Sequence, residues 1–421
     1  SGNDTAVMGS SISDDGETIV VSEGLMDTPN GENSGRVRVF DWNGTDWVQR
    51  GVAIDGEHSN DVMTQYGISA DGNTILSNSR LNDDGGTDVG QARVFDWDGS
   101  AWVQRGSAFN GAADGDNIRS LLSKNGNSVA ITAGTANATL GIDAKKGTTT
   151  IYDWNGSSWT QRGTAIEGLE DGDEARVSGF TSDMNTISIS SPVFDDGGAD
   201  DTNKGHVRVF DWDGSSWTQR GAAFVGDAGD SLAGGALTED GMTLVTGSMN
   251  RTVDGNAQAG RARVWDWNGS TWTQRGSDIT GDSAYDLFGG AGILDAMGTT
   301  LSILGLDYMG TAYGGGGRNE VYQFPLDTNK AIKALDKALD GVNSERAKYG
   351  AVMNRLEYSV ENLTNIAQNT AAARSRILDT DYARETTELA RTQIIQQAST
   401  AMLSQANQQG AAILELLRPF E

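Results

Sequence analysis

The sequence has no cysteine, only two histidines and no long hydrophobic run. Without cysteine the chain can form no disulfide, no thiolate metal site and no cysteine nucleophile. His58 and His206 are the only two histidines and each has a polar sequence context, so with no cysteine a transition-metal site is nearly excluded. No segment approaches the roughly 18 apolar residues that a transmembrane helix requires. A transition-metal enzyme and a protein that spans a membrane with helices are therefore not expected.

Motifs of the common enzyme classes are also missing. The sequence contains no glycine-rich phosphate loop, no nucleophile elbow and no zincin helix. Its many carboxylates offer pairs that could hydrolyse a glycosidic bond, but no two of them stand out from the rest. We therefore expect no enzymatic activity, no catalytic residues, no cofactor and no bound metal.

Basic charge is scarce in the first part of the chain. The 421 residues include 31 Lys and Arg against 58 Asp and Glu, which gives a formal net charge of −27. Residues 327–421 contain 11 of these basic residues and 12 of the acidic ones, so almost all of the excess negative charge precedes residue 327. A front segment of this charge repels nucleic acid and anionic membrane surfaces, and neither is an expected partner.

The segment from Asp327 to Glu421 has no tryptophan and only three of the 56 glycines. Its apolar residues follow one another at alternating spacings of three and four, interrupted at Arg346, in the order Ile332, Leu335, Leu339, Val342, Tyr349, Met353, Leu356, Val360 and Leu363. This spacing is the heptad pattern of a long helix that packs against another helix. We predict a helix over Asn329–Asn369 with a coiled-coil type of seam.

A second helix is predicted over Tyr382–Leu417. The preceding run from Ser375 to Asp381 includes Ser, Asp and Thr, which are residue types that cap helix N-termini. The predicted helix is rich in Gln, Ala and Thr and nearly uncharged after Arg391, and a weakly charged helix usually becomes surrounded by protein. We expect packing between molecules, with a local helical bundle as the alternative.

Several motifs of this tail resemble the C-terminal region of bacterial flagellin. They include the stretch around Met353, Asn354, Arg355 and Leu356, the block from Ser375, Arg376, Ile377 and Leu378 through Asp379, Asp381, Tyr382 and Ala383, and the run from Gln393, Ile394 and Gln397 to Gln405, Ala406 and Asn407. Gln409-Gly410-Ala411 stands where the family commonly has a proline, and the chain continues slightly past the usual end of the family.

The resemblance implies a subunit of an extracellular bacterial flagellar filament, which polymerises with copies of itself through its terminal helices. It further implies a flagellar export chaperone and cap or junction proteins as partners. The residues expected to pack in the assembly are Leu335, Leu339, Val342, Met353, Asn354, Arg355, Leu356, Leu363, Ser375, Arg376, Ile377, Asp379, Asp381, Tyr382, Ala383, Gln393, Ile394, Gln397, Leu403, Gln405, Ala406 and Asn407. The N-terminal helical region of the family is not found in the sequence, which opens directly in β-type sequence at Ser1.

The first 325 residues consist of repeats. A motif of Asp-Trp, then Asn-Gly or Asp-Gly, then Trp and Gln-Arg-Gly recurs five times, with its first tryptophan at Trp42, Trp97, Trp154, Trp212 and Trp267. Asn-Gly and Asp-Gly between strand-forming residues predict hairpins with type I′ turns. Another predicted pair of strands precedes each hairpin, so each unit of about 56 residues contains four strands.

Four-stranded antiparallel units in series are typical of an all-β propeller, and a solenoid is the alternative. We place the propeller at 1–325, with units at about 1–54, 55–109, 110–166, 167–224, 225–279 and 280–325, followed by the all-α tail at 326–421. The sixth unit lacks its last hairpin strand. We expect that strand upstream of Ser1, and a whole further unit there would give seven blades.

Other candidate sites in the repeats have simpler structural explanations. Asp41 and Arg50, like their equivalents, are expected to pair or cap within each unit rather than to bind a ligand. The hairpin tryptophans are expected to pack in the core or between blades rather than to bind carbohydrate. The acidic loops Asn82–Asp88 and Asp195–Asp201 lack the alternating spacing of a calcium loop and are expected to be solvated turns. The competing function is a surface binding module, a propeller adhesin or lectin on a helical stalk.

Overall fold

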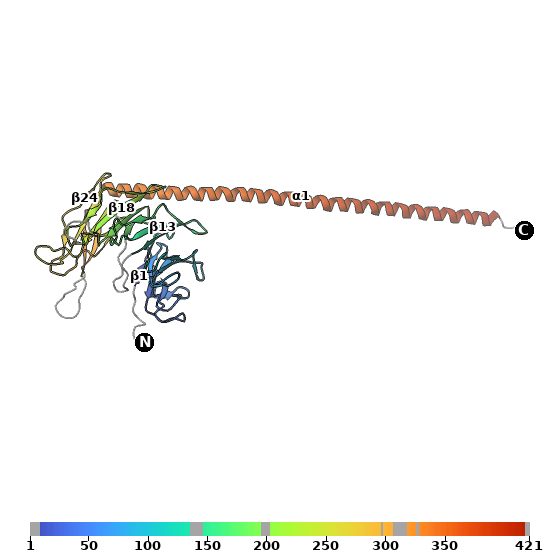
Figure 1. Cartoon of the computed structure of the whole chain (residues 1–421). Helices are drawn as coiled ribbons and strands as arrows, with labels where there is room; N and C mark the ends of the chain where they lie inside the picture. Colours follow the sequence, from blue (N-terminus) through green and yellow to red (C-terminus); the bar gives the residue numbers. More distant parts are fainter. Residues whose placement is uncertain are drawn as a thin grey trace. The chain divides into compact units, whose positions relative to one another are not determined.

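The computed structural model of the chain describes residues 9–134, 146–194, 203–295, 298–305, 318–325 and 328–416. It divides the chain into two compact units, Ser1–Ala334 and Leu335–Glu421. The first unit contains all 28 described strands, and helix α1 (Thr328–Leu416) accounts for the described part of the second (Figure 1). The all-β and all-α parts predicted from the sequence are confirmed.

The strands form six antiparallel sheets that follow one another in the sequence. The first three sheets contain β1 (Gly9–Ile12), β2 (Thr18–Glu23), β3 (Arg36–Trp42), β4 (Trp47–Gln49) and β5 (Ile54–Asp55); β6 (Met63–Ile68), β7 (Thr74–Ser79), β8 (Gln91–Trp97), β9 (Trp102–Gln104) and β10 (Phe109–Asn110); and β11 (Arg119–Leu122), β12 (Ser128–Ala133), β13 (Thr148–Trp154), β14 (Trp159–Gln161) and β15 (Ile166–Glu167).

The last three sheets repeat this arrangement and then shorten it. They contain β16 (Arg176–Phe180), β17 (Thr186–Ser191), β18 (His206–Trp212), β19 (Trp217–Gln219) and β20 (Phe224–Val225); β21 (Ala233–Leu237), β22 (Thr243–Ser248), β23 (Arg261–Trp267), β24 (Trp272–Gln274) and β25 (Ile279–Thr280); and β26 (Ala291–Leu294), β27 (Thr300–Gly305) and β28 (Arg318–Gln323). The sixth sheet therefore has three described strands, as the incomplete sixth repeat predicted.

The fourth strand of each complete sheet is split into two short pieces. In the first sheet both β4 and β5 pair with β3: Trp42 lies opposite Trp47, and Arg36 lies opposite Asp55. The interruption includes Gly51, whose φ of +75° is unfavourable for residues with a side chain. The predicted count of four strands per unit holds if the two pieces are taken as one outer strand.

The hairpin turns differ from the prediction. Asn43 and Asp46 close a four-residue loop through a bond from the Asn43 amide to the Asp46 carbonyl. Gly44 has a φ of +96°, whereas Asn43 is not among the residues with positive φ. A type I′ turn needs positive φ at two successive residues, so that assignment is wrong. The Asn43 side chain instead accepts the amide hydrogens of Thr45 and Asp46, which stabilises the loop.

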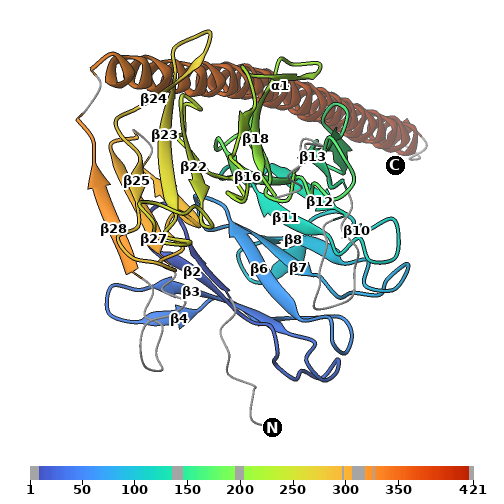
Figure 2. The ribbon, with the colours of Figure 1, turned by 60° about the vertical axis from the view of Figure 1, so that its left-hand side comes forward.

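The core of the β unit lies between successive sheets. The five apolar clusters of the described residues each combine side chains from two neighbouring sheets, for example Ile151 from the third with Ile187 from the fourth. Strands β7, β17 and β22 are buried at every residue because neighbours cover both faces. β2 and β27, in the first and last sheets, alternate instead. Figure 2 shows the sheets following one another around the unit, which is the blade arrangement of a β-propeller.

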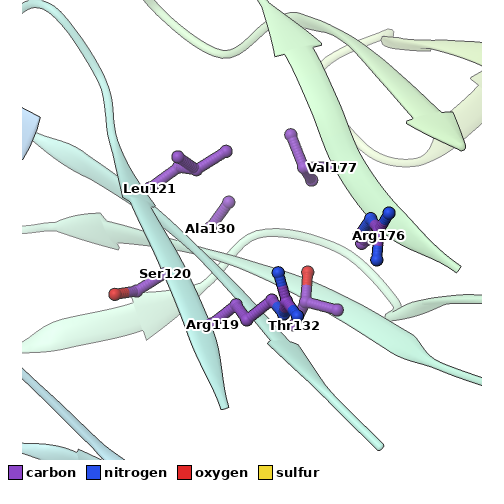
Figure 3. A pocket seen from close by; sticks show the side chains of 7 residues that line it. All are labelled: Arg119, Ser120, Leu121, Ala130, Thr132, Arg176 and Val177. Carbon is purple, nitrogen blue, oxygen red and sulfur yellow. The ribbon is translucent and has the colours of Figure 1, made fainter. Parts of the chain in front are cut away.

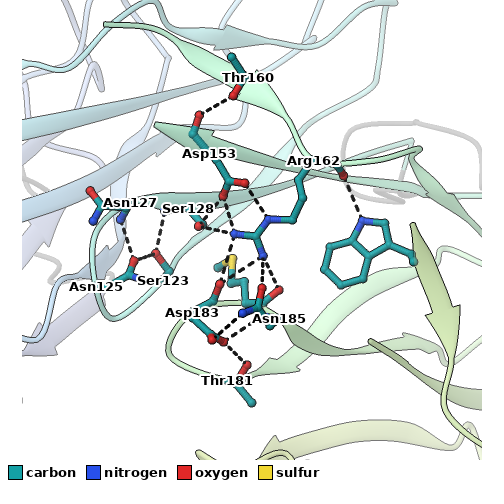
Figure 4. A network of polar contacts seen from close by, with 12 residues as sticks. Ser123, Asn125, Asn127, Ser128, Asp153, Thr160, Arg162, Thr181, Asp183 and Asn185 are labelled. Atoms are coloured by element: carbon teal, nitrogen blue, oxygen red, sulfur yellow. Dashed lines mark hydrogen bonds and ion pairs between the residues drawn. The ribbon is translucent and has the colours of Figure 1, made fainter. Parts of the chain in front are cut away.

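One arginine of each complete repeat joins its own sheet to the next. Arg162 contacts Asp153 and Ser128 of the third sheet, and it donates a hydrogen bond of 2.9 Å to the carbonyl of Met184 in the fourth unit (Figure 4). Burial alone would raise the pKa of Asp153, but the bonds from Arg162 and Ser128 hold that pKa below its usual value. The same pairing recurs as Arg50–Asp41, Arg105–Asp96, Arg220–Asp211 and Arg275–Asp266. The predicted pairing within each unit is confirmed, and the bond to the next unit adds to it.

The hairpin tryptophans pack against the preceding repeat. The second hairpin tryptophan donates its indole N–H to the carbonyl of the arginine of the preceding repeat, at 2.9–3.1 Å. This bond is made by Trp102, Trp159, Trp217 and Trp272. The Arg50 guanidinium also lies 4.9 Å from the ring centre of Trp97, a cation–π contact. Packing between blades is thus confirmed for these rings. In the first sheet Trp42 and Trp47 remain 41% and 40% exposed.

A matched pair of glycines tests how closely neighbouring sheets approach each other at this contact. Gly163 and Gly276 occupy the same repeat position with φ of +67° and +73°. A Cβ on Gly163 would lie 2.5 Å from the Trp212 ring, whereas one on Gly276 would meet nothing within 4 Å. We expect Gly276→Ala to lower the free energy of unfolding by about 1 kcal/mol, through backbone strain alone. Gly163→Ala should cost about 2 to 3 kcal/mol because overpacking is added. Urea unfolding followed by tryptophan fluorescence tests this, and equal losses would contradict it.

Helix α1 is continuous over 89 residues, so the predicted break between two helices is wrong. The stretch Ser375–Asp381 lies inside the helix rather than at a helix start. Its capping residue types cost a helix only a few tenths of a kcal/mol each, while no proline or glycine interrupts residues 351–409. Residues 371–373, all alanine, favour helix on the N-terminal side, and the helix therefore continues through the stretch.

Candidate functional site: the exposed surface of helix α1

Helix α1 leaves its large apolar side chains in water. With a rise of 1.5 Å per residue, its 89 residues extend for about 130 Å. The large apolar residues whose exposure is given are all between 50% and 74% exposed, namely Ile332, Leu339, Val342, Tyr349, Val352, Met353, Leu356, Tyr358, Val360, Leu363, Ile366, Ile377, Leu378, Tyr382, Leu389, Ile394, Ile395, Met402, Leu403, Ile413 and Leu414. Large apolar residues exposed along such a length are typical of a protein interface.

The apolar residues lie on more than one side of the helix. Leu356, Val360 and Leu363 follow the heptad seam predicted from the sequence. Tyr358 is 73% exposed and comes two residues after Leu356, so it lies roughly 200° further around the helix. Ile377 and Tyr382 differ by five residues and are likewise separated by about 140°. A single partner helix covers only one stripe, so more than one neighbouring helix is needed to bury this surface.

Several threonine hydroxyls of α1 already have hydrogen-bond partners within the helix. Thr364 donates to the carbonyl of Val360 at 2.8 Å, and Thr392 and Thr400 make the same bond to the residue four positions earlier. A polar group that enters an interface without a hydrogen bond costs free energy. Because these hydroxyls keep their partners when the surrounding water is removed, they add little cost to burial of the helix.

The structure places all residues of the predicted assembly set on α1. Every side chain of this set that the structure describes is exposed, namely those of Leu339, Val342, Met353, Asn354, Arg355, Leu356, Leu363, Ser375, Arg376, Ile377, Tyr382, Ala383, Gln393, Ile394, Gln397, Leu403, Gln405, Ala406 and Asn407. The side chains of Leu335, Asp379 and Asp381 lie outside the described part. Val352, Tyr358 and Ile366 belong to the same surface but were not predicted, because they fall off the heptad seam.

The acidic loops of the β unit show internal hydrogen bonds where they are described. The Asn82 side chain accepts the amide hydrogen of Asp84, and Asp83 accepts that of Asp88, both within 2.9 Å. Burial, with a smaller contribution from Asp83, raises the pKa of Asp88. The second loop, Asp195–Asp201, lies outside the described residues. Among the described residues no group of three or more metal-ligating side chains converges.

The β unit was compared with solved structures. It resembles the β-propeller domain of the Trilobed protease from Pyrococcus furiosus at 12% identity, covering 77% of this chain and 84% of that one, with a TM-score of 0.45. A putative 6-phosphogluconolactonase from Bacteroides uniformis matches at 12% identity over 76% of this chain and 86% of that one, with a TM-score of 0.46. Likeness at this level says nothing about activity.

The helix was compared with protein families and curated proteins. Residues 332–417 match the bacterial flagellin C-terminal helical region. B-type flagellin of Pseudomonas aeruginosa is 52% identical over 88 residues, which are 21% of this chain and 18% of that protein. Flagellin of Bacillus subtilis is 51% identical over 87 residues, 21% of this chain and 29% of that protein. Flagellin of Halalkalibacterium halodurans is 50% identical over 92 residues, 22% of this chain and 34% of that protein.

The match and the geometry concern the same residues. The chain spans between 18% and 34% of the length of these relatives, and the shared part is the helix whose apolar surface is exposed. Among the described residues, α1 contains no stretch hydrophobic enough to span a lipid bilayer. Residues 332–417, which include most of α1, therefore resemble the C-terminal helical region of bacterial flagellin.

Proposed function

We propose that the chain is a structural subunit of an extracellular bacterial flagellar filament, held in the polymer by helix α1. The observation that carries the proposal is the exposed apolar surface of α1, on residues 332–417 that match the flagellin C-terminal region. Fully burying a Leu, Ile or Met side chain contributes about 1.5 to 3 kcal/mol, and about twenty large apolar residues are available. Contact with sibling helices would supply that burial.

The distribution of apolar residues favours a polymer over a simple dimer. A two-stranded coiled coil buries one seam, whereas α1 exposes apolar residues on several sides, such as Leu356 and Tyr358. In a tubular assembly each helix has several neighbours, so every side can be covered. The partners of α1 would accordingly be copies of this chain or of a related flagellin. An export chaperone and cap or junction proteins are further proposed partners, on the flagellin likeness alone.

The propeller would be displayed outward from the filament. Most of the net charge of −27 belongs to the residues before 327, and like charge on neighbouring propellers would limit contact among them. We propose no enzymatic role. The repeated Asp–Arg pairs stabilise the sheets, and the hairpin tryptophans pack between neighbouring blades. The competing proposal, an adhesin or lectin on a helical stalk, would need a ligand surface elsewhere on the propeller.

Electron microscopy separates the two proposals. The chain is mixed with monomeric Bacillus subtilis flagellin and short filament seeds, and negatively stained filaments are compared with filaments grown without it. We expect filaments that carry globular projections and sediment together with the chain. Smooth filaments with the chain left in the supernatant would contradict the filament role. Glycan binding by that unassembled chain would then favour the adhesin or lectin.

A further inference from the structure

A pocket between the third and fourth sheets contains two arginines that do not form the pairs of the repeat. The cavity is about 180 Å³ and includes Arg119 and Leu121 of β11, Ala130 and Thr132 of β12, and Arg176 and Val177 of β16. Figure 3 shows Arg119 and Thr132 beside one another, with Arg176 across the pocket and Leu121 and Val177 further along its walls. The pocket therefore has a cationic part and an apolar part.

These two arginines are not required by the repeat. Arg119 and Arg176 each lie three residues after an aspartate that binds the preceding loop, Asp116 and Asp173 respectively. The residues at the same distance from the corresponding aspartates in the second and fifth units are Thr64 and Ala233. A role in holding the blades together would need a cation in every unit, as it does for Arg50 and its equivalents.

The local charges are poorly compensated. The Nε of Arg119 and the hydroxyl of Ser120 are buried without a hydrogen-bond partner among the described residues. Burial and the charge of Arg119 lower the pKa of Arg176, and Glu174, the carboxylate near it, is 3.9 Å away. Burial raises the pKa of Glu174. Two guanidinium groups and one carboxylate leave a net positive charge in a chain of net charge −27.

We propose that this pocket binds a small organic carboxylate that carries an apolar substituent. The guanidinium fork matches a carboxylate with two parallel hydrogen bonds, and the second arginine adds charge. Leu121, Ala130 and Val177 would cover the apolar part of the ligand. The site is independent of the filament role, because all of its residues belong to the β unit.

Calorimetric titration of the full chain with benzoate, acetate and phosphate at constant ionic strength tests the site. We expect saturable binding of benzoate, at least about tenfold tighter than that of acetate or phosphate, because neither of these carries an apolar group large enough to fill the pocket. Arg119→Gln and Arg176→Gln should each weaken benzoate binding by about tenfold or more. Lys124→Gln removes an exposed cation of the same sheet and should leave binding unchanged.

The melting temperature of the variants distinguishes a ligand site from a structural role. Removing one of two poorly paired guanidiniums should leave the melting temperature equal or higher without ligand. The proposal is overturned if benzoate does not bind, if both glutamine variants bind it as the wild type does, or if phosphate binds as tightly. Loss of the folded state in both variants would assign the arginines to stability and would equally reject the site.

Discussion

Replacing Leu403 with aspartate is expected to abolish incorporation of the chain into flagellin filaments. Leu403 is 64% exposed in the single chain, so the variant should fold normally. A carboxylate at that position becomes buried without a partner once neighbouring helices cover it, which costs several kcal/mol per subunit. Sedimentation of seeded filaments measures the incorporated fraction, which should fall from most of the chain to background.

Val52→Asp provides the matched control for that experiment. Val52 is 84% exposed and belongs to the propeller, so the same change of charge is made at an exposed apolar residue away from α1. Its incorporation should equal that of the wild type. If both variants are excluded, non-specific charge repulsion is the cause, and if neither is excluded, the surface around Leu403 does not pack in the filament.

Acid is expected to destabilise the β unit through His206. This residue begins β18, is 1% exposed, and has no hydrogen-bond partner on either ring nitrogen among the described residues. Burial, the largest cause, and the charge of Arg208 lower the pKa of His206 to about 4, against a smaller opposing effect of Asp173. The unfolded chain binds this proton near pH 6.5 and the folded chain near pH 4, so stability is lost as the pH falls between these values.

The loss amounts to roughly 3 kcal/mol over that window, since each unit of pKa shift corresponds to about 1.4 kcal/mol. His206→Gln is the matched variant, because Gln91 stands at the same position in β8 and is also buried. Urea unfolding at pH 7 and at pH 4 should show a larger decrease for the wild type than for the variant. Equal decreases would contradict the lowered pKa of His206 in the folded chain.

The repeats could be predicted from the sequence because the same short motifs recur in the first five units. Asp-Trp and Trp-x-Gln-Arg-Gly predicted strands whose tryptophans lie opposite each other, as Trp42 and Trp47 do. The turn type was mistaken because a side-chain acceptor on Asn43 provides an alternative to positive φ at that residue. The split of the outer strand was missed, although the recurring Gln-Arg-Gly, whose glycine has positive φ, was a signal for it.

The helical type of the tail was predicted correctly, but its continuity was not. Heptad spacing identified Leu356, Val360 and Leu363, and these residues are exposed as an interface requires. The capping residue types in Ser375–Asp381 led to the wrong prediction of a helix start, since such side chains mark a helix end only where the backbone also leaves the helical conformation. The pocket at Arg119 and Arg176 was missed, because it depends on a comparison of equivalent positions between units rather than on any motif.

Cysteine accessibility before and after assembly tests the central claim most directly, because the natural chain has no thiol. Leu403→Cys and Val52→Cys each introduce one exposed thiol, on α1 and on the propeller respectively. In the free chain both should react with a maleimide reagent at similar rates. In filaments the thiol of the Leu403→Cys variant should react with maleimide at least about tenfold more slowly than in the free chain. The reaction rate of the Val52→Cys variant should be unchanged. An unchanged rate for the Leu403→Cys variant in filaments would contradict burial of α1 among sibling helices.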